Sequence, residues 1–207
     1  MPRGACPRFR SDAAANRDEL ARIAGAGFLA AGVDAAGHGA RAVPDMDARM
    51  AAARGGALEV MLTLARETAA EVPGIVAALA AEGLADPARV SMAGVSMGGF
   101  LVYLAAPLVP GLRAAVAMLG SPEWPAHDSA HLRPDAFHDV ALLSITAERD
   151  VNVPPEPARR FHDALAGSHP RPERARHVEL PDAEHLMREE QWRAMMDAMT
   201  EWLLIHG

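Results

Sequence analysis

Apolar positions along this chain follow two patterns that alternate, short uninterrupted runs and longer stripes at helical spacing. The runs lack the strict polar alternation of a half-exposed strand, as expected of parallel strands covered by helices on both faces. Five of them are predicted strands: Phe28 to Val33, Val90 to Gly94, Ala114 to Leu119, Ala141 to Thr146 and Ala175 to Leu180. The alternation predicts an α/β fold with a mostly parallel sheet and helices on both faces.

Helical patterns fill the segments between these runs. They are Asn16 to Ala24, Asp47 to Glu82, Gly98 to Ala105, Glu156 to Ala166 and Glu190 to Ile205. Asn16 and Glu19 have the spacing of a capping box. The long tract is expected to break near Gly55 and Gly56 or at Pro73. Residues 40–72 are a candidate for an inserted helix near the mouth of a site, the alternative being an amphipathic helix packed on the sheet.

Length and composition limit the protein class. The 207 residues suit a single domain, 1–207, and half of them are hydrophobic. The net charge of −7, without a clustered basic face, argues against nucleic-acid binding. No apolar run is long enough for a membrane span and the start does not resemble a signal peptide. The single cysteine, Cys6, cannot form an internal disulfide, so we expect a cytoplasmic protein.

The segment around Ser96 is the strongest chemical signal. Gly94-Val95-Ser96-Met97-Gly98 follows a predicted strand and opens a predicted helix, the context in which G-x-S-x-G indicates a nucleophile elbow. The glycines permit a tight turn that leaves the serine hydroxyl above the sheet. The backbone N–H of Met97 then points from a helix N-terminus toward the same space and is a candidate oxyanion donor.

A serine hydroxyl needs a base to accept its proton and an acid to orient that base. Asp150 and His185 each follow a predicted strand, and parallel strands place such loops at one edge of the sheet. The order Ser, Asp, His along the chain is the expected one. Glu148, two residues from Asp150, is the main alternative acid, and Asp182 and Glu184 share the loop of His185.

Other histidines have simpler interpretations. His38 is expected to shape the loop after the first predicted strand. His127, His131 and His138 lie in a Pro- and His-rich segment but lack the helical spacing of a zinc pair. We therefore predict no metal and no cofactor.

With these motifs in place, the chain resembles small bacterial carboxylesterases of the α/β-hydrolase superfamily, near the dienelactone-hydrolase and prolyl-oligopeptidase-like branches. The resemblance runs from Ala13 to His206 and includes the elbow, the segment Arg149 to Pro154, and Glu184-His185. It implies that Ser96, Asp150 and His185 are nucleophile, acid and base. It implies a serine hydrolase that cleaves small carboxylic esters through an acyl-enzyme. Its motifs do not identify the substrate.

The N-terminus departs from that family pattern, which has two or three further strands and a His-Gly loop bearing a second oxyanion donor. The corresponding stretch is Cys6 to Ser11, and counting back from Gly27 places Phe9 nearest the donor position. N-terminal strands are therefore expected to be missing or reduced. A sheet edge left open in this way can pair with a second chain, so a homodimer is a hypothesis.

The connection from Gly120 to Asp139 is too short for a large lid, which favours an open site for a small-molecule ester. Trp124, Phe137 and Met187 are candidate apolar walls, with core or surface packing as the alternative for each. Two other functions remain open. One is an amide or thioester hydrolase or an acyltransferase using the same three residues, and the other is a non-catalytic binding protein with an impaired oxyanion hole.

Overall fold

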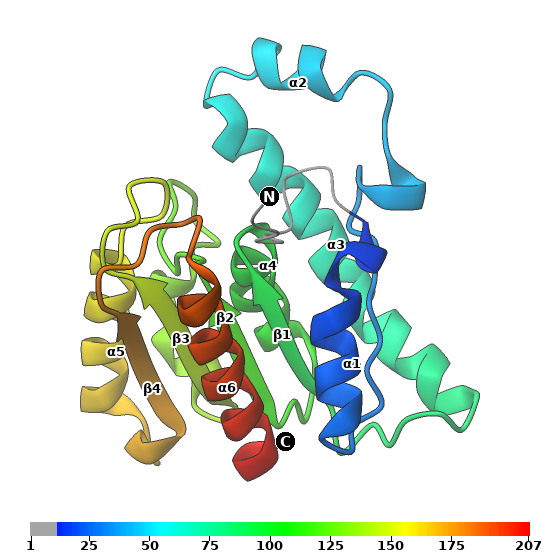
Figure 1. The fold of residues 1–207 in the computed structure, drawn as a ribbon, viewed down its shortest axis with the longest axis vertical. Helices are drawn as coiled ribbons and strands as arrows, with labels where there is room; N and C mark the ends of the chain where they lie inside the picture. Colours follow the sequence, from blue (N-terminus) through cyan, green and yellow to red (C-terminus); the bar gives the residue numbers. More distant parts are fainter. Residues whose placement is uncertain (1–11) are drawn as a thin grey trace.

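Four parallel strands form the centre of the molecule in a computed structural model, which describes residues 12–207. They are β1 (Ser91–Val95), β2 (Ala114–Met118), β3 (Ala141–Ala147) and β4 (Ala175–Leu180). Their spatial order equals their order in sequence, and every neighbouring pair is parallel. The carboxyl ends of all four strands therefore meet at one edge, the upper edge in Figure 1. Four of the five predicted strands are confirmed.

Helices cover both faces of this sheet, which confirms the predicted α/β class (Figure 1). The helix bounds are α1 (Arg17–Gly25), α2 (Met46–Ala52), α3 (Gly56–Ala81), α4 (Met97–Ala105), α5 (Glu156–Ser168) and α6 (Glu189–His206). Within residues 12–207, no helix is both long and apolar enough to cross a membrane.

The two faces are held by two apolar cores that share the central strands. Alternate residues of a strand point to opposite faces, so Ala115 and Leu142 join the core beneath α4 and α5, while Val116 and Leu143 join the core beneath α6. All five residues of β2 and all seven of β3 are buried. This explains why their sequences show continuous apolar runs instead of alternation.

The long tract predicted between residues 47 and 82 divides where its two glycines lie. Gly56 begins α3 with a φ of +67°, a left-handed conformation that glycine adopts without strain. Pro73 instead lies inside α3, which continues to Ala81. In Figure 1, α2 lies beyond the carboxyl ends of the strands, and it packs on α3 through Met46 and Leu64. Its role as an inserted helix at the site mouth stays a prediction.

The capping box predicted at Asn16 does not form. The Asn16 side chain makes no capping hydrogen bond, because a short 3-10 turn, Ala13–Asn16, already precedes α1. Asp12 caps that turn instead, accepting a hydrogen bond from the backbone N–H of Ala15 at 3.0 Å. The helical start is therefore one turn earlier than the sequence pattern indicates.

The predicted strand from Phe28 to Val33 is wrong, since this segment has no regular secondary structure. A strand is defined by backbone pairing with a neighbour, and the described residues offer this segment none. Phe28 is partly buried against the core beneath α6, but Leu29 and Val33 are 57% and 47% exposed, so most of the segment does not lie between layers. An apolar sequence does not show whether a pairing partner is present among residues 12–207.

Strand β1 is an edge of the sheet, since within residues 12–207 it pairs only with β2. One row of its backbone groups is consequently free of sheet pairing among those residues, the situation that permits addition of a further strand. Dimerisation through this edge remains a prediction, which light scattering would contradict by finding a monomer at micromolar concentration.

Candidate active site

Ser96 occupies the sharp turn between β1 and α4. Its φ of 56° and ψ of −115° are unusual for a residue with a side chain. The turn is fixed from the adjacent strand, since the Ser96 backbone N–H donates to the carbonyl oxygen of Met118 at 2.8 Å. Strained conformations of this kind are maintained where the surrounding structure determines them, which is typical of reactive sites.

Glycines make this turn possible by removing side-chain atoms where backbones meet. A Cβ on Gly94 would lie 2.2 Å from the carbonyl oxygen of Gly98, and one on Gly99 would lie 2.6 Å from that of Met118. Gly99 also faces Gly120, whose Cα would be 2.9 Å from that Cβ. The start of α4 therefore packs directly on the backbone that follows β2. The elbow motif accounts for Gly94 and Gly98, whereas Gly120 lies outside the motif and has no signal in the sequence.

The three residues singled out in the sequence form one hydrogen-bonded chain. His185 Nε2 lies 3.0 Å from Ser96 Oγ, and His185 Nδ1 lies 2.6 Å from Asp150 Oδ2. An ionised carboxylate can only accept, so Nδ1 carries the proton in this pairing and Nε2 of the neutral ring is free to accept from the serine hydroxyl. The arrangement can thus remove a proton from Ser96 and hold the resulting imidazolium next to a negative charge.

Asp150 is the buried member of this chain. Its side chain is 0% exposed, against 15% for His185. Its other oxygen, Oδ1, accepts hydrogen bonds from the backbone N–H groups of Asn152 at 2.9 Å and Val153 at 2.8 Å. With both oxygens bound, the carboxylate has a fixed orientation and its burial is compensated.

Glu148, the alternative acid, is engaged elsewhere. Its Oε2 accepts from the backbone N–H of Asp182 at 2.7 Å, an exposed contact. The backbone N–H of Arg149 donates to Ala183 at 2.8 Å, and the Arg149 side chain forms an ion pair with Asp182. These contacts join the loop of Asp150 to the loop of His185. These contacts could not be predicted from the sequence, because pairing between two loops leaves no characteristic residue spacing.

The predicted oxyanion donors have different outcomes. Met97 is the first residue of α4, so its backbone N–H has no partner within the helix and lies beside Ser96. That position agrees with the predicted role and with the positive end of the helix dipole. Phe9, the second predicted donor, lies outside the described residues and stays a prediction.

The three predicted apolar walls lie in different environments. Phe137 is 1% exposed and packs edge-to-face against Tyr103 and Phe161 in the core, so the structure does not bring it to the triad. Met187 follows His185 by two residues and is partly buried against the core beneath α6. Both remain predictions as pocket residues, with core packing the simpler account of Phe137.

Trp124 anchors the loop that follows β2 and Gly120. It is 3% exposed, and its ring centroid lies 6.2 Å from that of Phe100, the residue after Gly99. Its indole N–H donates to Asp128 at 2.9 Å, and Asp128 also accepts two hydrogen bonds from Arg66 of α3. The guanidinium of Arg66 holds the pKa of Asp128 well below its usual range. Trp124 thus connects the loop to the helix that carries the elbow.

The remaining histidines form no metal site in the part of the chain that the structure describes. His38 Nδ1 lies 2.8 Å from the carbonyl oxygen of Ala36, within its own loop as predicted. His131 Nδ1 contacts Ser129 at 2.7 Å, and His138 Nε2 contacts Ser168 at 3.3 Å.

A parallel sheet with a serine on a strained strand-to-helix turn, in reach of a histidine from a later strand, defines the class of α/β-hydrolases. Comparison with family models makes the assignment more specific. The model described as "Dienelactone hydrolase family" matches residues 13–201, and the chain belongs to that family. This agrees with the branch of the superfamily that the sequence resembles.

Several solved structures share this fold. Protein TT1662 from Thermus thermophilus superposes with a TM-score of 0.68 and 22% identity, covering 94% of this chain and 85% of that one. A putative dienelactone hydrolase from Klebsiella pneumoniae gives 0.53 at 21% identity, over 66% of this chain and 60% of that one. Esterase PE8 gives 0.54 at 19% identity, over 71% and 64%. Identities this low establish the fold alone. Among curated proteins no match is found.

Proposed function

We propose that this protein is a carboxylesterase-like serine hydrolase that cleaves small carboxylic esters through an acyl-enzyme. The observation that carries the proposal is the continuous hydrogen-bonded chain from Ser96 Oγ through His185 to the buried Asp150. The family name supports ester chemistry, since a lactone is a cyclic ester, and so does the similarity to an esterase.

In the first half of the reaction, Ser96 Oγ attacks the carbonyl carbon of the ester while its proton passes to His185 Nε2. The carbonyl oxygen becomes an oxyanion beside the N–H of Met97, and the imidazolium is stabilised by Asp150. Collapse of this intermediate breaks the bond to the alcohol. The alcohol leaves with the proton from Nε2, and the acyl group remains on Ser96.

In the second half, water takes the position of the alcohol. His185 Nε2 accepts a proton from the water as its oxygen attacks the acyl carbon, and the same proton returns to Ser96 Oγ when the acid departs. The net reaction consumes the ester and one water, and Ser96, His185 and Asp150 return to their starting state. Phe9 would supply a second oxyanion donor if the family pattern applies to the start of this chain.

The test is hydrolysis of p-nitrophenyl esters of graded acyl length by the full chain, with Ser96→Ala as the control. We expect turnover of the short acyl esters, and loss of roughly 10⁴-fold or more in kcat with Ser96→Ala. A parallel series of p-nitroanilides distinguishes ester from amide preference, and we expect the esters to react faster. Equal turnover by both proteins, or none across the ester panel, would contradict the proposal.

A further inference from the structure

A cavity lies at the opposite end of the sheet from Ser96. It has a volume of about 530 Å³ and is formed by residues that precede the strands, together with the last turn of α6. Arg113 precedes β2, Arg171 and Arg174 precede β4, and His206 ends α6. Because the triad residues follow their strands, the full length of the sheet separates this cavity from the candidate active site.

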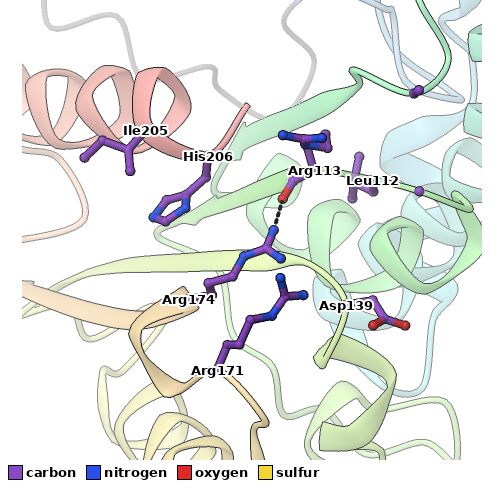
Figure 2. A pocket seen from close by; sticks show the side chains of 9 residues that line it. Leu112, Arg113, Asp139, Arg171, Arg174, Ile205 and His206 are labelled. Carbon is purple, nitrogen blue, oxygen red and sulfur yellow. Dashed lines mark hydrogen bonds between the residues drawn. The ribbon is translucent and has the colours of Figure 1, made fainter.

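Three arginines from two segments line this cavity. Figure 2 shows the guanidinium groups of Arg171 and Arg174 near each other, with Arg174 donating to the Arg113 carbonyl oxygen at 3.0 Å, while the Arg113 guanidinium lies on the other side of its own backbone. Within residues 12–207, none of the three forms an ion pair. Nine other arginines do so: Arg22, Arg41, Arg49, Arg66, Arg149, Arg159, Arg160, Arg188 and Arg193. In a chain with a net charge of −7, this is a local excess of positive charge.

The nearby acids do not neutralise this excess. The charges of Glu173 and of Asp139, the acidic residue of the lining, both raise the pKa of Arg174, but these effects are smaller than those that lower it. Burial lowers the pKa of Arg174, and the charges of Arg171 and Arg113 lower it further. The pKa of His206 is lowered by burial and then by Arg174. The guanidinium groups therefore repel one another, and a bound anion would relieve that repulsion.

The rest of the lining is apolar. Leu112 is buried beside Arg113, and Ile205 is 64% exposed next to His206. Ile205 thus places one exposed apolar side chain beside the arginines, and the cavity volume lies in the range of small-molecule sites. The guanidinium forks of two neighbouring arginines suit the three terminal oxygens of a phosphate better than the two oxygens of a carboxylate.

We propose that this arginine cavity is a binding site for a small organic phosphate, whose phosphate contacts Arg171 and Arg174 with Arg113 adding positive charge nearby, and whose apolar part contacts Ile205. The proposal is independent of esterase activity, since it uses none of the triad residues. A long polyanion does not suit a single cavity on an acidic protein.

The experiment is calorimetric titration of the full chain with phenyl phosphate, inorganic phosphate and benzoate. The measurements use Ser96→Ala, so that binding at the nucleophile is kept apart from binding at the arginines. We expect phenyl phosphate to bind most tightly, inorganic phosphate more weakly because it lacks the ring, and benzoate most weakly. Absence of saturable phenyl phosphate binding would overturn the proposal. Inorganic phosphate or benzoate binding as tightly as phenyl phosphate would overturn its assignment to organic phosphates.

Variants locate the site. Arg113→Gln and Arg171→Gln each remove an exposed guanidinium that makes no hydrogen bond within residues 12–207, so both proteins should fold, which circular dichroism verifies. Each should weaken phenyl phosphate binding roughly ten- to a hundredfold. Arg54→Gln is the matched control, an exposed arginine outside the cavity, and should bind as the parent does. Unchanged affinity in both cavity variants would place the binding elsewhere and refute the proposal.

Discussion

The two ends of the sheet differ in how their polar groups are satisfied. At the carboxyl end, Asp150 accepts three hydrogen bonds and His185 connects it to Ser96. At the amino end, Arg113 and Arg171 have no ion-pair partner among the described residues. The first arrangement is complete within the chain, as a preorganised reaction centre must be. The second is incomplete, as expected of a surface whose partner is a ligand. We therefore expect substitutions at the carboxyl end to lower activity or stability, and removal of an arginine at the amino end to raise the free energy of unfolding slightly.

The largest effect is expected at Asp150. Asp150→Asn keeps the size of the side chain but removes the charge that fixes the tautomer of His185, so kcat for an ester should fall about 10⁴-fold. The matched control is Glu148→Gln, two residues away, which retains an acceptor for the N–H of Asp182 and should keep most of the activity. Steady-state kinetics decides between the two acids, because a larger loss in the Glu148 variant would reverse the assignment.

The second largest effect is expected at Gly99, where the backbone of α4 packs against the carbonyl oxygen of Met118 near Ser96. Gly99→Ala would place a methyl group 2.6 Å from the carbonyl oxygen of Met118, where two backbones meet and neither can move freely. We expect the free energy of unfolding to fall by about 3 kcal/mol or more. Gly74→Ala is the control, since nothing lies within 4 Å of its Cβ position inside α3, and it should gain about 0.5–1 kcal/mol. Urea denaturation measures both, and equal stability of the two variants would exclude the tight contact.

The smallest effect is expected at the amino end. Arg171→Gln removes one of three mutually repelling charges, so without ligand the free energy of unfolding should stay within about 0.5 kcal/mol of the parent value, shifted upward. The gain should disappear at high salt, because screening already weakens the repulsion. A clear loss of stability on urea denaturation would mean that Arg171 has a structural partner, and the contrast between the two ends would fail.

Much of this architecture follows from local patterns in the sequence. Continuous apolar runs located all four strands, and the elbow motif placed Ser96 between a strand and a helix. Parallel strands carry their following loops to one edge, which is why Asp150 and His185 could be associated with Ser96 across more than 50 residues.

The remainder depends on tertiary contacts that no local pattern encodes. Phe28 to Val33 is apolar enough for a strand, yet strand formation also requires a neighbour. Phe137 has an aromatic side chain that would suit a pocket wall, but it packs in the core against Tyr103. The arginine cavity collects residues that precede different strands, so its members share no motif.

The central claim is that Ser96 is the nucleophile activated by His185 and Asp150, and covalent labelling tests it most directly. The full chain is treated with a fluorophosphonate and its intact mass is measured, with Ser96→Ala as the control. The account predicts one adduct per chain, located at Ser96 by peptide mapping, and none in the variant. An unchanged mass of the parent protein, or an equal adduct in Ser96→Ala, would contradict it.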